Sequence, residues 1–216
     1  MPLYVLDKDL LFPPAEGADE DGLLAIGGDL SMERLLLAYR HGIFPWYEDN
    51  YILWWCPDPR FVLFPGELRV SNSMKQIIKK GELEFSVNRN FSGVISKCKS
   101  ISRRGQEGTW ITEDMRNAYV NLHLHGYAHS AEAWQDGELV GGLYGIRMGK
   151  LFFGESMFST VSNASKFAFI RYVQLLQSEG VRLIDCQVYT SHLESLGARM
   201  IHRVDFLKFV KEKVDG

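Results

Sequence analysis

The chain has 216 residues, of which 46% are hydrophobic and 24% charged, and its formal net charge is -3. This composition excludes a disordered chain and is sufficient for one large domain, or for a main domain plus a small one. Because no apolar stretch approaches the roughly 20 residues that cross a bilayer, and residues 1–9 lack a signal-peptide pattern, we expect a cytoplasmic protein with no membrane partner.

The first 60 residues predict a small unit that contains one short helix. Ser31 suits the N-cap position, an apolar stripe that includes Tyr39 follows it, and a glycine ends the helix. Further along, two prolines flank Asp58 and favour a rigid, extended connection. We therefore predict a small N-terminal α/β domain over residues 1–60 and a second domain over residues 61–216.

The second unit begins with a predicted strand over residues 61–64, and three amphipathic helices follow it. Apolar residues at helical spacing place these helices near residues 74–78, over residues 91–98 and from Thr112 to Gly126.

Basic residues are concentrated in the segment over residues 69–105. It carries nine Lys and Arg against two acids, whereas residues 1–60 carry 4 against 11. Such a segment attracts polyanions, so we expect a nucleic-acid face on the polar sides of these helices, with a solvated face as the alternative. The candidate contacts to the body of a nucleic acid are Lys75, Lys79, Lys80, Arg103 and Arg104.

Hairpin and helix signals dominate the rest of the chain. Asp136-Gly137 is a strong two-residue turn, and a helix begins at Ser162 or Asn163 and ends at Gly180. The predicted strands cover residues 128–135, 138–147, 151–158 and 182–189. Three antiparallel strands, a helix and a further strand resemble the core of the GNAT-type N-acyltransferases. We therefore predict an α+β fold with a mixed, mostly antiparallel sheet.

Coenzyme A binding is not predicted for this GNAT-like unit. An acyl-CoA enzyme of that type opens its helix with a glycine-rich loop that holds a pyrophosphate. The corresponding stretch here reads Ser162-Asn163-Ala164-Ser165-Lys166 and contains no glycine. The three cysteines, Cys56, Cys98 and Cys186, lack CxxC spacing, so we predict neither disulfides nor a metal site.

Polar residues interrupt two apolar segments of this unit. Glu155 lies in one predicted strand, and Asp185 and Gln187 lie in another. Residues two apart share a face of a strand, so Asp185 and Gln187 should project together while Cys186 points to the opposite face. Because buried charge is costly unless it is paired or used, the three residues indicate either a polar site or a bracing hydrogen-bond network.

The sequence motifs resemble those of the leucyl/phenylalanyl-tRNA-protein transferase family over nearly the whole chain. The matching blocks are Gly22 to Ser31, His41 to Trp46, Leu53 to Arg60, Gly108 to Thr112, Ala128 to Ser130, Glu138 to Gly145, Gly154 to Ser159, Asn163 to Lys166 and Leu183 to Gln187. The resemblance implies transfer of Leu or Phe, and sometimes Met, from aminoacyl-tRNA to an N-terminal Arg or Lys, which marks the acceptor protein for degradation. It implies no cofactor, and we expect a monomer.

The resemblance also implies roles for individual residues. Asp185 would polarise Gln187, whose amide carbonyl would orient the attacking amine, and Glu155 would hold the aminoacyl group or the cationic acceptor. The implied aminoacyl pocket consists of Leu143, Met157, Phe169, Tyr172 and Leu176. The implied contacts to the terminal adenosine of the tRNA, where an aromatic face can stack on the base, are Trp46, Trp110 and Tyr119.

Two other functions stay open on the sequence alone. One is an N-acyltransferase that uses a different acyl donor. The missing glycine loop argues against coenzyme A as that donor. The other is a binding module for the 3′ end of tRNA that has lost its activity, against which Glu155, Asp185 and Gln187 argue.

Overall fold

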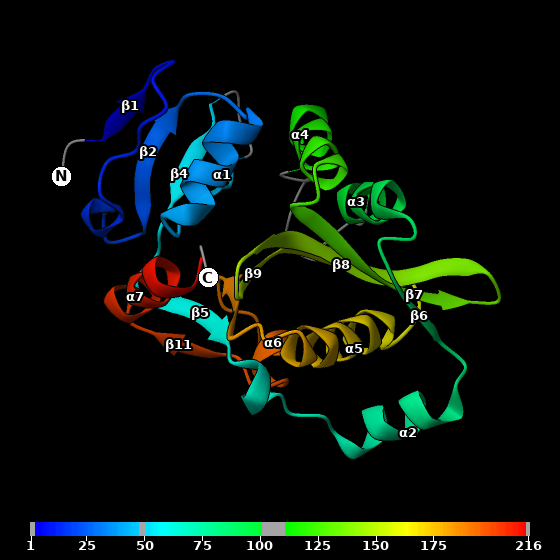
Figure 1. The fold of residues 1–216 in the computed structure, drawn as a ribbon. Helices are drawn as coiled ribbons and strands as arrows, with labels where there is room; N and C mark the ends of the chain where they lie inside the picture. The colour runs from blue at the N-terminus through cyan, green and yellow to red at the C-terminus, as the bar shows by residue number, and fades with distance from the viewer. Residues whose placement is uncertain (1–2, 48–50, 101–110, 215–216) are drawn as a thin grey trace.

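Two β-sheets form the framework of the protein, and the chain passes from the first to the second between residues 55 and 60 (Figure 1). The computed structural model describes residues 3–47, 51–100 and 111–214. The first sheet has the strand order β1-β2-β4-β3 and the second the order β11-β5-β10-β9-β8-β7-β6. The strands of the first sheet are β1 (Tyr4–Leu6), β2 (Leu23–Gly27), β3 (Phe44–Pro45) and β4 (Leu53–Trp55). Those of the second sheet are β5 (Arg60–Leu63), β6 (Glu84–Val87), β7 (Ala128–Gln135), β8 (Glu138–Met148), β9 (Leu151–Ser159), β10 (Leu183–Gln187) and β11 (Arg199–Ile201).

Seven α-helices within the described ranges pack on these sheets. They are α1 (Met32–Arg40), α2 (Asn72–Lys80), α3 (Phe91–Ser100), α4 (Glu113–Leu124), α5 (Ala164–Ser178), α6 (Ser191–Glu194) and α7 (Arg203–Lys213). Two short 3-10 turns, Ala15–Gly17 and Pro65–Glu67, complete the set. In the part of the chain that the structure describes, no helix is both long enough and apolar enough to cross a membrane.

The ends of α1 follow from local chemistry. The Ser31 hydroxyl accepts a hydrogen bond from the Arg34 N–H, so it caps the first turn as predicted. Gly42 adopts a left-handed φ of 71° just beyond the last turn, a conformation that glycine adopts without strain. Tyr39 is fully buried near the C-terminal end of this helix.

The strands and helices predicted for the second unit occur in the predicted order, and β6 is an additional strand between α2 and α3. Asp136 and Gly137 both have left-handed φ angles, 52° and 82°, as a tight two-residue hairpin requires. Strands β7, β8 and β9 form an antiparallel meander, and β10 pairs in parallel with β9 after α5. The domain is therefore an α+β unit with a mixed, mostly antiparallel sheet.

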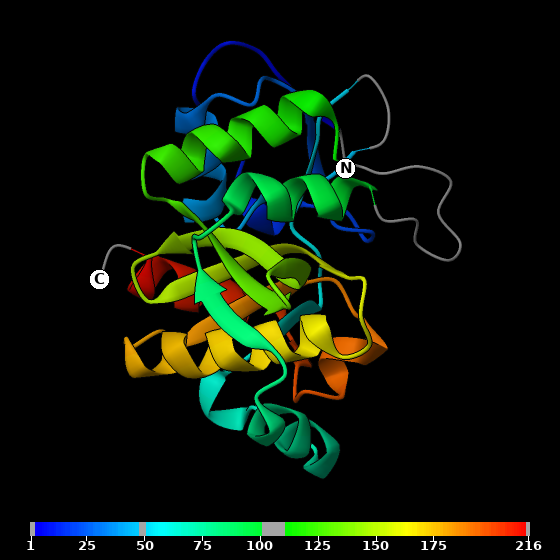
Figure 2. The same ribbon diagram turned by 90° about the vertical axis from the view of Figure 1, so that its right-hand side faces the viewer.

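The second sheet is covered on both faces (Figures 1 and 2). Helices α3 and α4 pack on one face, α5 packs on the other, and α2 lies against α5. Helices α2 and α3, which both belong to the basic segment, therefore lie on opposite sides of the sheet. The nucleic-acid face on these helices stays a prediction, and the edge strand β6, which runs between α2 and α3, divides its described part between the two sides of the sheet.

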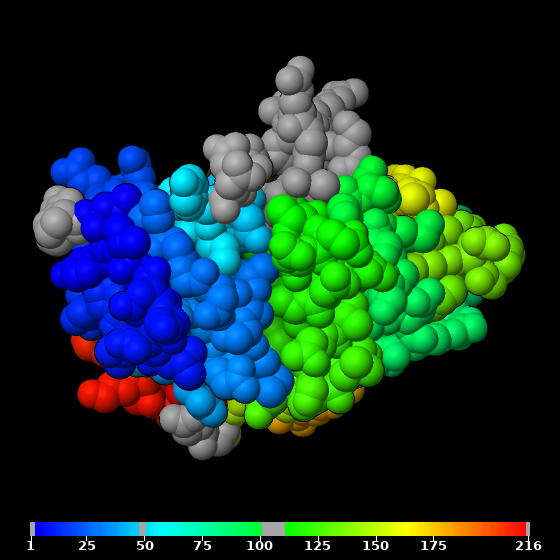
Figure 3. All heavy atoms as spheres, turned by 90° about the horizontal axis from the view of Figure 1, so that it is seen from above, coloured from blue at the N-terminus to red at the C-terminus, as the bar shows by residue number. Residues whose placement is uncertain are grey.

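One apolar core joins the first sheet to the α3 and α4 side of the second sheet. It contains Tyr39 and Trp54 from the first unit together with Tyr119 and Ile146 from the second. Figure 3 shows the first unit and α4 side by side along the upper surface of the molecule. The two units thus share buried surface where α1 meets α4.

Candidate active site

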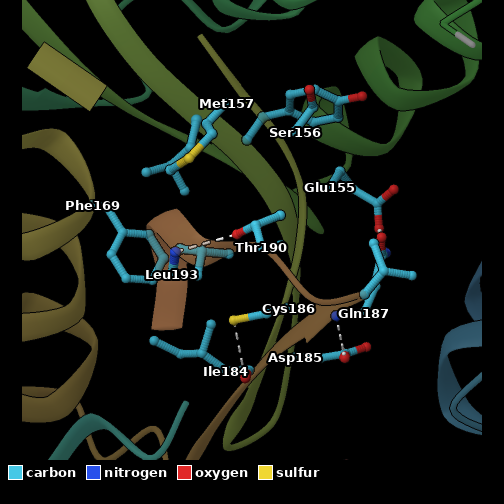
Figure 4. Close-up of a pocket in the computed structure, with 14 residues that line it drawn as sticks. Glu155, Ser156, Met157, Phe169, Ile184, Asp185, Cys186, Gln187, Thr190 and Leu193 are labelled. Atoms are coloured by element: carbon cyan, nitrogen blue, oxygen red, sulfur yellow. Dashed lines mark hydrogen bonds between the residues drawn. The ribbon is translucent and has the colours of Figure 1, made fainter. Parts of the chain in front are cut away.

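A cavity of about 290 Å³ opens where β9 and β10 separate. The parallel pairing of these strands ends at Phe153 and Asp185, so the residues that follow are free to line a space between them. Glu155 and Gln187 lie on its polar wall and Met157 on its apolar wall (Figure 4). Apolar lining around a few converging polar groups is typical of a small-molecule site.

Irregular pairing shapes both polar strands of this site. Glu155 is the extra residue of a bulge, because Gly154 and Ser156 pair with consecutive residues of β8. Cys186 is the extra residue of a second bulge, opposite β5, and Gln187 beside it has a left-handed φ of 62°. Bulges re-aim side chains near active sites. The strict alternation predicted for β10 is therefore wrong, and Cys186 also lines the cavity.

Three side chains hold the carboxylate of Glu155. The hydroxyls of Tyr39 and Tyr119 donate to it at 2.7 Å and 3.0 Å, and Nε2 of Gln187 donates at 2.8 Å. The two hydroxyl oxygens lie 2.5 Å apart. Burial, together with the charge of Glu155, raises the pKa of both tyrosines, so each stays a protonated donor.

Glu155 has an affinity for protons that suits acid–base chemistry near neutral pH. Burial raises its pKa from 4.5 to about 7, and the charge of Asp185 acts in the same direction. The hydrogen bonds from Tyr39, Tyr119 and Gln187 favour the ionised form and oppose that rise. A carboxyl group with such a pKa can both accept and return a proton at physiological pH.

Asp185 forms a buried ion pair with Arg60, the first residue of β5. The guanidinium donates from Nε to Oδ1 at 2.8 Å and from Nη2 to Oδ2 at 2.6 Å. Both side chains are fully buried. The rings of Phe44 and Phe206 lie 4.6 Å and 4.4 Å from the guanidinium carbon, in the range of cation–π contacts.

The contact between Asp185 and Gln187 differs from the expected one. The Asp185 carboxylate accepts the backbone N–H of Gln187 at 2.9 Å, whereas the Gln187 side-chain amide donates to Glu155. The implied polarisation of the amide by Asp185 therefore has no direct hydrogen bond among the described residues. Because Nε2 is engaged with Glu155, the amide carbonyl oxygen is the end available to a substrate.

The implied aminoacyl pocket is only partly assembled at the cavity. Leu143, Met157 and Phe169 line it, as the resemblance implies. Tyr172 and Leu176 do not: both are buried in the apolar core between α5 and the sheet, and Tyr172 packs edge-on against Phe152. Both residues therefore belong to the core and not to the pocket. Their helical spacing is equally consistent with a core position.

The residues implied for the terminal adenosine have different environments. Trp46 is half-buried beside Trp55, with ring centroids 5.9 Å apart. Tyr119 is fully buried and packs edge-on against Tyr144, so it offers its hydroxyl to Glu155 and no exposed ring face to a base. The stacking role is therefore wrong for Tyr119 in this structure. Trp110 lies outside the described residues.

Three of the candidate contacts to the tRNA body lie on α2. Lys75, Lys79 and Lys80 are exposed on α2, because its apolar residues face α5. Arg103 and Arg104 lie outside the described residues.

Sequence reasoning missed two members of the site, Arg60 and Tyr39. Arg60 was detectable as a charge at the start of an apolar strand, Arg60-Phe61-Val62-Leu63, by the same criterion that identifies Asp185. Tyr39 gave no separate signal, since its position on the apolar stripe of α1 describes a core residue equally well.

Within the described ranges, no cluster of three or more histidines, cysteines or acids is placed to hold a metal ion. The three cysteines are buried thiols. The groups that converge on the cavity are therefore an acid with a near-neutral pKa, an amide carbonyl and an apolar wall, which together can position an amine and an acyl group.

Comparison with known proteins agrees with this chemistry. The family profile described as leucyl/phenylalanyl-tRNA protein transferase matches residues 62–211, and the profile of its N-terminal domain matches residues 28–58. The leucyl/phenylalanyl-tRNA--protein transferase of Flavobacterium johnsoniae is 58% identical over 212 residues, which is 98% of this chain and 100% of the relative. That of Syntrophobacter fumaroxidans is 53% identical over 215 residues, which is 99% of this chain and 92% of the relative.

Two solved structures with more distant sequences are also similar. L-PGS of Bacillus licheniformis has a TM-score of 0.45 at 12% identity, over 63% of this chain and 49% of that chain. An aminoglycoside acetyltransferase from a soil metagenome has a TM-score of 0.41 at 12% identity, over 61% of this chain and 88% of that chain. The profile match over most of the sequence and the full-length relatives decide the assignment: the chain belongs to the leucyl/phenylalanyl-tRNA protein transferase family.

Proposed function

We propose that this aminoacyltransferase moves Leu or Phe, and less often Met, from aminoacyl-tRNA to the N-terminal Arg or Lys of an acceptor protein. The observation that carries the proposal is the Gln187–Glu155 hydrogen bond at the wall of an apolar cavity. It places an amide carbonyl and a titratable acid beside a space that suits an apolar side chain. The protein would act as a monomer in the cytoplasm, and the added residue would mark the acceptor for degradation.

The reaction needs one nucleophilic attack and one net proton transfer. The α-amine of the acceptor attacks the carbonyl carbon of the aminoacyl ester, a C–N bond forms, and the C–O bond to the terminal ribose breaks. One proton passes from the amine nitrogen to the 3′ oxygen of the tRNA. The Gln187 carbonyl accepts an N–H of the amine and orients its lone pair, since an amide is too weak a base to remove the proton.

Glu155 serves as the proton carrier in this proposal. Its pKa of about 7 lets the ionised form take the proton of the amine and the protonated form give it to the departing 3′ oxygen. The protonated carboxyl completes the contacts around Tyr39 and Tyr119, because the two hydroxyl protons can fill only two of the three close contacts and the carboxyl supplies the third proton.

The apolar wall of the cavity would select the donor. Phe169 from α5 and Met157 from β9 face this space (Figure 4). Phe169→Ala is expected to enlarge it and to shift the ratio of kcat/KM for Phe-tRNA over Leu-tRNA upward by about 10-fold or more, as pocket changes of this size do. Competition between the two charged tRNAs measures the ratio.

Leu176→Ala is the matched control for the donor selectivity. It makes a similar large-to-small change on the same helix, but Leu176 lies in the core outside the cavity. It should lower thermal stability and leave the donor ratio unchanged. An equal shift in both variants would contradict a selecting role for Phe169.

The tRNA would approach from the side of the molecule where Trp46 follows β3. Trp46 and Trp110 are the proposed platforms for the terminal adenosine, because aromatic faces stack on any base. Lys75, Lys79 and Lys80 on α2, with Arg103 and Arg104, are the proposed contacts to phosphates of the tRNA body, since such contacts supply most of the nonspecific affinity.

A direct transfer assay tests the proposed function. The purified protein is given radiolabelled Leu-tRNA and peptides that begin with Arg, Lys or Gly. Label should appear on the Arg and Lys peptides and not on the Gly peptide. If neither the Arg peptide nor the Lys peptide acquires label while the charged tRNA is still intact at the end of the assay, the proposed activity is refuted. Label on all three would refute the acceptor selectivity alone.

A further inference from the structure

We propose that Arg60 is a positioning residue for catalysis: it holds Asp185, and Asp185 fixes the backbone turn that directs the Gln187 amide onto Glu155. The inference rests on the proposed function and extends it to a residue outside the cavity wall. Arg60 does not line the cavity, and its effect on the reaction passes through two other residues.

Four contacts restrain the guanidinium of Arg60. Its Nε and Nη2 bind the two carboxylate oxygens of Asp185 at 2.8 Å and 2.6 Å. Phe44 from β3 covers one part of the guanidinium and Phe206 from α7 another, with both ring centroids within 4.6 Å of its central carbon. A planar guanidinium that binds two carboxylate oxygens and contacts two aromatic rings has little freedom to tilt.

Asp185 transmits this constraint to the backbone of Gln187. Its Oδ1 accepts two hydrogen bonds, one from Nε of Arg60 and one from the N–H of Gln187 at 2.9 Å. Gln187 has a left-handed φ of 62°, which a residue with a Cβ adopts only where its surroundings hold it there. A tilt of the carboxylate would therefore move the Gln187 turn.

The last step of the chain reaches the reacting groups. With its backbone in this turn, Gln187 directs Nε2 to Oε1 of Glu155 at 2.8 Å. This bond stabilises the ionised carboxylate and so lowers the pKa of Glu155 against the effect of burial. The other groups that act on Glu155 are Tyr39 from α1, Tyr119 from α4, Asp185 from β10 and the charge of Arg60 from β5, which Arg60→Lys retains. A displaced Gln187 should consequently raise the pKa of Glu155.

Arg60→Lys tests the proposal, because lysine keeps the charge and cannot form the two-pronged contact. We expect kcat for leucyl transfer to fall by about 10- to 100-fold and KM for Leu-tRNA to change less than about threefold. In NMR titrations of the free protein, the Glu155 carboxyl should titrate at a higher pH than in the wild type. This second readout needs no substrate.

Arg34→Lys is the matched control. Arg34 is the other fully buried arginine of the described chain, and it binds the carbonyl oxygens of Asp7 and Asp9 in the first unit. Its replacement should lower the melting temperature while leaving kcat and the Glu155 titration at wild-type values. Unchanged kcat and an unchanged Glu155 titration in Arg60→Lys would overturn the proposal and leave Arg60 a purely structural role.

A second variant covers the case in which Arg60→Lys does not fold. Phe206→Leu keeps an apolar side chain against Arg60 but removes the aromatic face that restrains the guanidinium. It should move kcat and the Glu155 titration in the same directions as Arg60→Lys, by smaller factors, and no movement in either would refute the chain of contacts. A wild-type protein that fails to transfer Leu would refute the proposed function instead, and the Glu155 titrations would still decide the positioning role.

Discussion

Glu155→Gln is expected to lower kcat for leucyl transfer by about 10²- to 10⁴-fold, the range in which a positioned acid or base contributes. Glutamine has the same shape: its oxygen can accept from Tyr39 and Gln187 at the Oε1 position, and its NH₂ group can donate to the Tyr119 oxygen, so the cavity should persist. The change removes a carboxyl group whose pKa is raised to about 7. Single-turnover transfer from Leu-tRNA to an Arg peptide measures the effect.

The pH dependence of the same reaction provides an independent check of Glu155. Wild-type kcat should rise as the pH increases through about 7, because the ionised form of Glu155 is the one that accepts a proton. The residual activity of Glu155→Gln should show no such step. A wild-type step that persists in the variant would assign the titration to another group.

Glu132→Gln is the matched control for this acid. Glu132 on β7 is also buried, and it accepts hydrogen bonds from the hydroxyl of Ser130 and from the backbone N–H groups of Arg89 and Asn90. It does not line the cavity. The control variant should lose stability and keep kcat, whereas equal losses of kcat in both variants would contradict a specific role for Glu155.

Arg60→Met is expected to lower the free energy of unfolding by about 3–5 kcal/mol, because it leaves the buried carboxylate of Asp185 without a cation. The double variant Arg60→Met/Asp185→Leu should recover most of that loss, since it removes both buried charges together. Urea unfolding of the three proteins at neutral pH measures the difference.

Arg199→Met controls for the loss of an arginine contact as such. Arg199 binds both carboxylate oxygens of Glu67 at 2.9 Å and 3.2 Å, but both side chains are about half exposed. An exposed pair of this kind contributes about 0–1 kcal/mol. If Arg60→Met lowered the free energy of unfolding by no more than Arg199→Met does, the Asp185 carboxylate would have found another partner or reached water.

Periodicity in the sequence predicts the elements around the site but not the geometry inside it. The hairpin at Asp136-Gly137, the N-caps Ser31 and Thr112 and the helix after Asn163 depend on neighbouring residues, so local chemistry determines them. The bulges at Glu155 and Cys186 depend on how strands far apart in the chain register with one another. A strict period of two therefore predicts the presence of the polar residues and misplaces their directions.

Contacts between distant segments explain the other differences. Arg60 and Asp185 are 125 positions apart, and no local pattern links them. The basic segment looks continuous along the chain, but β6 carries it around the edge of the sheet, so α2 and α3 reach opposite faces. Helical spacing correctly predicts that Tyr172 and Leu176 are buried. It does not predict whether a buried side chain lies in the core or lines a cavity.

The hydrogen bond from Tyr39 to Glu155 crosses from the helix of the first sheet to a strand of the second. The apolar core is continuous across the same boundary. The chain changes from one sheet to the other at residues 55–60, but the two units share buried contacts across this point. Both units should therefore unfold in a single cooperative transition. Because the first unit contributes Tyr39 to the candidate active site, we expect that homologous transferases can exchange this unit only if the partner residues on β9 and α4 match it.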